Sequence, residues 1–212
     1  MLYSLPNLLT LSRIAVIPLI FLSAYSSFCF VNYLAGILFI AASITDYYDG
    51  KLARARGEVS AFGRLLDPIA DKLLVATALV VILVKDVKTA EGVVPIIHKI
   101  SYIPVFVILC RELLVSGLRE FLREVNVGLP VTRLAKWKTG FQMTALSMLF
   151  FKGLFYWGGI GEILLWIAGG LTFVTGYQYF EKSLEYIKQE NSSKSAESKK
   201  TASSKNNTKT KK

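Results

Sequence analysis

Four aspartates stand between two long apolar stretches of the chain: Asp46, Asp49, Asp67 and Asp71. Carboxylates in or beside hydrocarbon cost free energy, so in membrane chains they usually serve a function and pair with cations. Carboxylate oxygens are ligands that Mg²⁺, Ca²⁺ and Mn²⁺ prefer. We therefore expect the four side chains to bind divalent metal. The alternative for any one of them is an ion pair at the membrane surface.

The spacing of these aspartates places them on two helix faces. The positions that share the first face, at i, i+3, i+4 and i+7, are Asp46, Asp49, Gly50 and Ala53. The positions that share the second face, at i, i+4 and i+8, are Gly63, Asp67 and Asp71. Residues at these intervals project from the same side of an α-helix. Because only a short basic loop separates the two helices, the acidic faces can meet and form a site for two metal ions.

Small residues and an arginine accompany the aspartates. Gly50, Ala53 and Gly63 lack bulky side chains, so a ligand can approach the backbone there. Arg54 is placed to meet a phosphate, for which the planar guanidinium is suited. Metal ions combined with arginine around oxygen ligands indicate a phosphate-containing substrate.

The elements that must position these residues are membrane helices. The chain has 212 residues, 53% of them hydrophobic, and several apolar runs approach the length of about 20 residues that spans a bilayer. The sequence predicts an all-α polytopic membrane protein with six transmembrane helices, over residues 5–26, 31–55, 65–85, 97–122, 132–153 and 160–187. We expect the first helix to be retained and not cleaved as a signal peptide, since Arg13 interrupts its apolar run.

Positive charge is unevenly distributed along the chain. The whole chain has a net charge of +10, and residues 191–212 alone carry seven lysines and one glutamate. We divide the chain into a membrane catalytic domain, 1–187, and a disordered lysine-rich tail, 188–212, either solvated or attached to anionic lipid. Lysine and arginine predominate in the tail and in the loops after the second and fourth helices. This bias predicts that both termini and the aspartates face the cytoplasm. No folded basic face accompanies the tail, so we expect no nucleic-acid partner.

The aspartate pattern resembles a known family signature. It reads D-x2-D-G-x2-A-R-x8-G-x3-D-x3-D from Asp46 to Asp71 and is similar, position for position, to that of the CDP-alcohol phosphotransferases. Three further stretches, PNLLTLSRIAVIPL, LLDPIADKLLV and CRELLVSGLRE, resemble the bacterial phosphatidylglycerophosphate synthase branch. The resemblance covers most of residues 4–180. It implies a six-helix fold, usually dimeric, in a bacterial inner membrane.

The resemblance also implies a reaction and roles for residues. The family moves a phosphatidyl group from CDP-diacylglycerol to an alcohol and releases CMP; in this branch the alcohol is sn-glycerol 3-phosphate. Two divalent ions, Mg²⁺ or Mn²⁺, would be held by Asp46, Asp49, Asp67 and Asp71, with Asp71 as general base in a direct in-line displacement. The implied CDP-binding positions are Asp46, Asp49, Gly50, Ala53, Arg54 and Gly63.

The acceptor's phosphate would need cations distinct from the metals. Arg111 and Arg119 are eight residues apart on one helix, hence near one face, and Lys136 follows on the next helix. We expect these three to bind the acceptor phosphate, with Thr10 and Arg13 as further candidates. Their alternative role is to set orientation and contact lipid headgroups.

Two other functions remain open on the sequence. The same chemistry with another acceptor (serine, an inositol phosphate, or phosphatidylglycerol as in a cardiolipin synthase) is the first. The second is a divalent-metal transporter that uses the four aspartates. Transporters commonly contain repeated halves with interrupted helices, and the sequence has no convincing internal repeat, so the enzyme is favoured.

Overall fold

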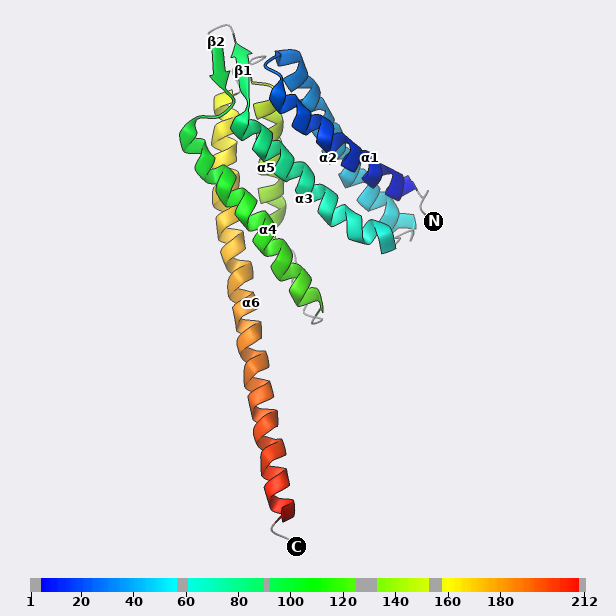
Figure 1. Cartoon of the computed structure of the whole chain (residues 1–212), viewed down its shortest axis with the longest axis vertical. Helices are drawn as coiled ribbons and strands as arrows, with labels where there is room; N and C mark the ends of the chain where they lie inside the picture. The colour runs from blue at the N-terminus through cyan, green and yellow to red at the C-terminus, as the bar shows by residue number, and fades with distance from the viewer. Residues whose placement is uncertain (1–4, 57–60, 90–91, 125–132, 153–157, 210–212) are drawn as a thin grey trace.

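The computed structural model describes residues 5–56, 61–89, 92–124, 133–152 and 158–209. This part of the chain is mainly helical, with a single β-hairpin (Figure 1). Its α-helices are α1 (Leu5–Leu22), α2 (Cys29–Arg56), α3 (Ala61–Val84), α4 (Tyr102–Glu124), α5 (Arg133–Phe150) and α6 (Gly158–Lys209). The predicted ranges of the six helices agree with the observed ones to within a few residues, apart from the C-terminal end of α6.

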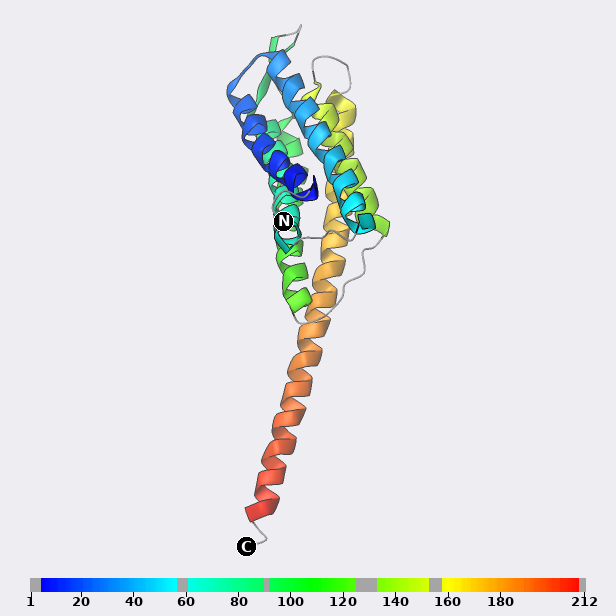
Figure 2. The ribbon, with the colours of Figure 1, turned by 90° about the vertical axis from the view of Figure 1, so that its right-hand side faces the viewer.

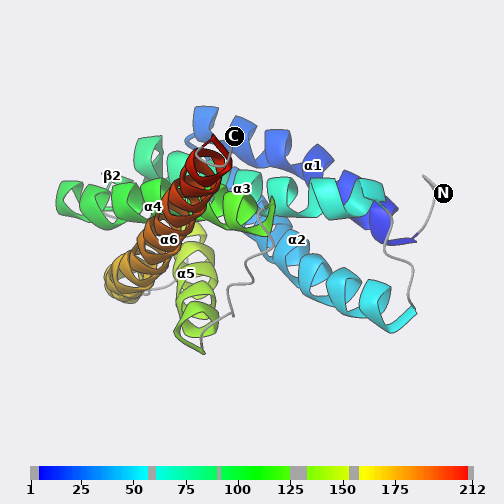
Figure 3. The ribbon, with the colours of Figure 1, turned by 90° about the horizontal axis from the view of Figure 1, so that it is seen from below.

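Consecutive helices run in opposite directions and form two groups. α1 packs on α2 and α3, α6 packs on α4 and α5, and contacts of α2 with α5 and α3 with α4 join the groups. Seen from below in Figure 3, α1, α2 and α3 spread to one side, and α4, α5 and α6 lie toward the other. As a result the C-terminal end of α2, the N-terminal end of α3, the C-terminal end of α4 and the N-terminal end of α5 lie toward the same end of the bundle.

The interior and the surface are both apolar, as in a membrane protein. Phe39, Leu79 and Leu146 are fully buried where the two groups meet, whereas Phe106 and Phe173 are among many large apolar side chains that remain exposed. In the described chain, α1, α2, α4 and α6 each contain a stretch long and apolar enough to cross a membrane. Exposed apolar surface of this extent indicates a lipid environment.

The polar stretch after α3 forms an element that the sequence reading did not predict. Strands β1 (Asp86–Thr89) and β2 (Gly92–Pro95) pair antiparallel, with Val87 opposite Val94. Gly92 has a φ of 121°, a conformation that glycine adopts without steric cost. The strands are only four residues long, and a pattern this short is weak beside the helical periodicity around it.

The C-terminal segment differs from the prediction of disorder. α6 continues through residues 188–209 as one helix that projects well beyond the bundle (Figures 1 and 2). Residues 188–209 contain no Gly or Pro to end the helix. Adding residues to an existing helix also avoids the cost of nucleating a new one. Polar composition, on which the prediction of disorder depended, does not exclude such a continuation.

Candidate active site

The first cluster of the site joins three helices through one buried arginine. Arg13 on α1 is 1% exposed, and its Nη1 lies 2.7 Å from Asp71 Oδ1 on α3 and 2.9 Å from Asp46 Oδ1 on α2. One turn earlier on α1, Thr10 Oγ1 donates a 2.6 Å hydrogen bond to Asp67 Oδ1. One nitrogen contacts both Asp46 and Asp71, so these two carboxylates lie beside each other. The predicted meeting of two acidic helix faces is therefore present for three of the four aspartates.

This cluster has more negative than positive charge in its described part. Its described part holds the three carboxylates of Asp46, Asp67 and Asp71 and one guanidinium, that of Arg13, which contacts Asp46 and Asp71. Asp46 and Asp71 are each partly exposed, so an ion can reach them. Among the described side chains no group of three or more Asp, Glu, His or Cys is arranged closely enough to hold a metal ion as it stands. The oxygen donors and the surplus of negative charge nonetheless fit a hard divalent cation.

The rest of the aspartate motif is described only in part. Asp49, Gly50, Ala53 and Arg54 belong to α2, but their side chains lie outside the described residues. Gly63 is buried on α3. The predicted roles of these five positions in metal and CDP binding therefore stay predictions.

The second cluster is cationic and lies between α4, α5 and α6. Arg111 Nη1 lies 3.3 Å from Glu112 Oε1, and Lys138 Nζ forms an ion pair with the same oxygen. Arg119 Nη2 donates to the Tyr179 hydroxyl at 3.3 Å. The guanidinium carbons of Arg111 and Arg119 lie 5.9 and 5.5 Å from the Tyr179 ring centroid, within the range of cation–π contacts. The two arginines that the sequence singled out thus share one aromatic partner.

The lysine in this cluster is not the one that the sequence reading chose. Lys136 is exposed on α5, whereas Lys138 is 4% exposed and forms the ion pair with Glu112. Lys138 precedes the buried Gln142 by four residues and Ala145 by seven, so the three share the inner face of α5. That periodicity was the signal available in the sequence. Lys136 stays a prediction as an acceptor ligand.

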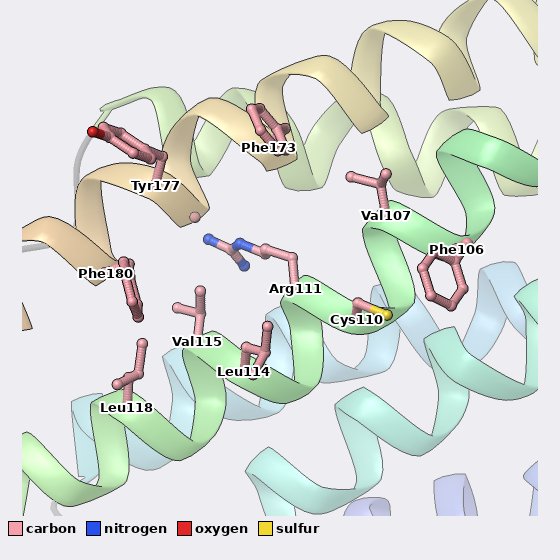
Figure 4. Close-up of a pocket in the computed structure, with 11 residues that line it drawn as sticks. Phe106, Val107, Cys110, Arg111, Leu114, Val115, Leu118, Phe173, Tyr177 and Phe180 are labelled. Carbon is pink, nitrogen blue, oxygen red and sulfur yellow. The ribbon is translucent and has the colours of Figure 1, made fainter.

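A groove between α4 and α6 surrounds the Arg111 side chain (Figure 4). Its volume is about 400 Å³, and most of its lining is apolar, including Leu114 and Phe180. Arg111 extends from α4 across to α6, where its Nη2 lies 3.4 Å from Thr175 Oγ1. A Cβ atom at Gly176 would lie only 2.9 Å from Arg111 Cγ, so the glycine provides the space in which the arginine lies.

Comparison with known proteins identifies relatives of this chain. A curated relative from Rickettsia felis is 46% identical over 87% of this chain and 97% of its own length. Relatives from Cereibacter sphaeroides and Bacillus subtilis are 38% and 36% identical over 89% of this chain and 99% and 100% of their lengths. All three are named CDP-diacylglycerol–glycerol-3-phosphate 3-phosphatidyltransferase.

The sequence model of one family matches most of the chain, over residues 3–174, and its description is CDP-alcohol phosphatidyltransferase. Enzymes of this family generally use a divalent metal. The prediction made from the aspartate pattern is confirmed: the chain belongs to the CDP-alcohol phosphatidyltransferase family.

Proposed function

We propose that this protein transfers the phosphatidyl group of CDP-diacylglycerol to sn-glycerol 3-phosphate, forming phosphatidylglycerophosphate and CMP. The observation that carries the proposal is the pairing of an acidic cluster with a separate cationic cluster in one bundle. The first suits a metal-bound pyrophosphate, and the second suits an acceptor that has its own phosphate. The names of the relatives from three bacterial genera support the same reaction.

In this proposal the four aspartates, Asp46, Asp49, Asp67 and Asp71, hold two divalent ions, Mg²⁺ or Mn²⁺. The ions would neutralise negative charge on the pyrophosphate of the lipid substrate. Thr10 and Arg13, which the sequence reading considered as acceptor contacts, hold three of these carboxylates in place. Such fixed orientation matters because most of the barrier reduction in phosphoryl transfer comes from positioning and charge stabilisation.

Asp71 is the proposed general base. It takes the proton from the acceptor hydroxyl, the hydroxyl oxygen attacks the β-phosphorus of CDP-diacylglycerol in line, and CMP leaves with the electron pair of the broken P–O bond. Gly50, Ala53, Arg54 and Gly63 would contact the CDP group. We propose a single displacement, without a covalent enzyme intermediate.

The cationic cluster is the proposed site of the acceptor phosphate. Arg111 and Arg119 are the predicted ligands, and the buried Lys138 joins them more readily than the exposed Lys136. Arginine and lysine bind phosphate through charge-assisted hydrogen bonds. A neutral acceptor such as serine would leave these charges without a ligand, which favours glycerol 3-phosphate over the uncharged alternatives.

The membrane arrangement follows from the two substrates. One is a lipid and the other is water-soluble, so the site must lie at the boundary between membrane and water. We propose that all six helices cross a bacterial inner membrane, with the site and both termini in the cytoplasm and a homodimer as the working unit. The basic loops beside the site support this orientation through the positive-inside rule.

CMP release tests the proposal directly. Detergent-purified protein would receive CDP-diacylglycerol and Mg²⁺ with glycerol 3-phosphate, glycerol, serine, inositol phosphate or phosphatidylglycerol, and Asp71→Asn protein would serve as the inactive control. We expect release only with glycerol 3-phosphate. Release with a different acceptor would keep the reaction class and overturn the acceptor. No release with any acceptor from folded protein would overturn the proposal.

A further inference from the structure

We propose that Glu112 is an exchangeable counter-anion inside the acceptor site: it neutralises Lys138 and Arg111 in the free protein, and the acceptor's phosphate takes over these contacts. This inference rests on the proposed function and deepens it. It makes Glu112 a specificity-determining residue, because only an acceptor with a strong negative charge can compete with a carboxylate that is already in place.

The geometry places Glu112 on the cations that a phosphate would use. Its Oε1 contacts Arg111 Nη1 at 3.3 Å and also accepts a hydrogen bond from Lys138 Nζ. The Lys138 side chain is 5% exposed, and that of Glu112 is 24% exposed. A buried ammonium without an anion is strongly destabilising, so Lys138 needs a partner when no substrate is bound. Glu112, which is closer to solvent, can leave more easily than the lysine can.

The cationic cluster has an excess of positive charge that a second anion would neutralise. Among the described contacts of this cluster, Arg111, Arg119 and Lys138 contribute three positive charges, and Glu112 contributes one negative charge. The net charge of +2 matches a phosphate dianion, whereas a neutral alcohol offers nothing to balance it. Glu112 also reduces the affinity of the site for anions in general, because like charges repel at short range.

A hydrogen-bond donor of the cluster also remains without a partner. Among the described residues, the Nε of Arg111 is buried and makes no hydrogen bond, while the Nη2 of the same guanidinium lies 3.4 Å from Thr175 Oγ1. Buried donors without partners are uncommon in folded proteins. The free donor on Arg111 supports an anion site that is only partly filled by Glu112.

The variant Glu112→Gln separates charge from shape, since glutamine keeps the size and one acceptor oxygen. Glu181→Gln makes the same change of charge at an exposed position on α6 and serves as the control. Thermal unfolding of the detergent-purified proteins would be followed with increasing inorganic phosphate and, separately, glycerol 3-phosphate. KM and kcat for glycerol 3-phosphate would be measured on the same samples.

We expect Glu112→Gln to unfold at a lower temperature than the original protein without phosphate, and to be stabilised more by phosphate. We expect its KM for glycerol 3-phosphate to fall roughly three- to tenfold, because competition by the carboxylate is gone. Glu181→Gln should behave like the original protein in both measurements. If Glu112→Gln does not fold, Glu112→Asp, which keeps the charge on a shorter side chain, should lower the same KM by a smaller factor.

A higher KM in Glu112→Gln, or an equal phosphate shift in variant and original protein, would overturn the proposal. Either result would assign Glu112 a direct contact with the acceptor or a purely structural role. Failure of the proposed function would give a different result from failure of this inference. In that case the original protein itself would show no stabilisation by glycerol 3-phosphate and no CMP release, whatever the behaviour of the variant.

Discussion

The two ends of the helical bundle differ in how their buried charged side chains are paired. At the hairpin end, each of three buried or half-buried charged residues has a partner within the protein. Lys85 Nζ donates to the Ser23 carbonyl at 2.7 Å, and Lys152 Nζ donates to the carbonyl of Ile96 at 2.7 Å. Glu162 accepts hydrogen bonds from Ser101 Oγ at 2.7 Å and from the His98 backbone amide, and its other oxygen lies 2.8 Å from His98 Nδ1.

At the opposite end the charges exceed what the described protein supplies. Asp46 and Asp71 share Arg13, with Asp67 one helical turn from Asp71, and Arg111 and Lys138 share Glu112, with Arg119 on the neighbouring Tyr179. At the hairpin end these buried charges are therefore paired within the protein, and their role is structural. Among the described side chains, the other end retains a negative surplus in one cluster and a positive surplus in the next, and we propose that each surplus is balanced by a bound ligand. This contrast supports the proposed position of the active site.

The largest expected effect on turnover comes from a comparison of Asp71, in the acidic cluster, with Asp86, at the hairpin end. Asp71→Asn removes the proposed base, and we expect CMP release to fall by at least about 100-fold, as for the loss of other general bases. Asp86→Asn makes the same change on β1 and should retain full turnover. Gel filtration would confirm that both variants are folded. Asp71→Asn protein with more than half of the original turnover would contradict the assignment.

A second comparison distinguishes two lysines of α5. Lys138→Gln should raise KM for glycerol 3-phosphate roughly tenfold, since a charge-assisted hydrogen bond contributes about 1.5–3 kcal/mol. Lys136→Gln changes an exposed side chain and should alter KM by less than about twofold. Steady-state kinetics at saturating CDP-diacylglycerol would check both. The reverse order of effects would return the acceptor role to Lys136.

A smaller effect is expected at Gly176. An alanine Cβ there would meet Arg111 Cγ at 2.9 Å, so the arginine must shift. We expect Gly176→Ala to raise KM for glycerol 3-phosphate roughly threefold, a fraction of what complete loss of a charged hydrogen bond would produce. Gly170→Ala lies on the same helix with nothing within 4 Å of the new Cβ, and should leave the kinetics unchanged. Equal kinetics in the two variants would show that Arg111 adapts without cost.

The smallest catalytic effect is expected at the hairpin end. Glu162→Ala removes the acceptor for Ser101 and His98, which should cost about 1–3 kcal/mol of stability and lower the unfolding midpoint by several degrees. KM and kcat should remain within about twofold of the original values. Unfolding in detergent and CMP release would be measured on one preparation. Loss of turnover without loss of stability would refute the structural role of this end.

Much of the fold could be predicted because it follows from apolar run length. The six helices lie close to their predicted positions, and four of them, α1, α2, α4 and α6, contain apolar runs long enough to cross a membrane. Two local features could not be predicted. The hairpin at Asp86–Pro95 depends on eight paired residues, and the helical extension to Lys209 depends on a helix that begins far upstream.

The part of the candidate site that depends on residue spacing along a single helix could be predicted from the sequence. Asp46, Asp67 and Asp71 meet as their helical intervals indicated. The partners of these and other charged groups depend on how separate helices pack, which no local pattern encodes. Arg13 beside two aspartates and Tyr179 between two arginines are contacts of this kind.

The most direct test of the contrast between the two clusters is a ligand-stabilisation measurement. Thermal unfolding of the original protein, of the Asp67→Asn/Asp71→Asn double variant and of Arg111→Gln would be recorded with Mn²⁺ or with glycerol 3-phosphate. A ligand that binds the folded state raises the unfolding midpoint. The account predicts that Mn²⁺ stabilises the original protein and Arg111→Gln but not the double variant. It predicts that glycerol 3-phosphate stabilises the original protein and the double variant but not Arg111→Gln. Equal stabilisation of all three proteins by either ligand would contradict it.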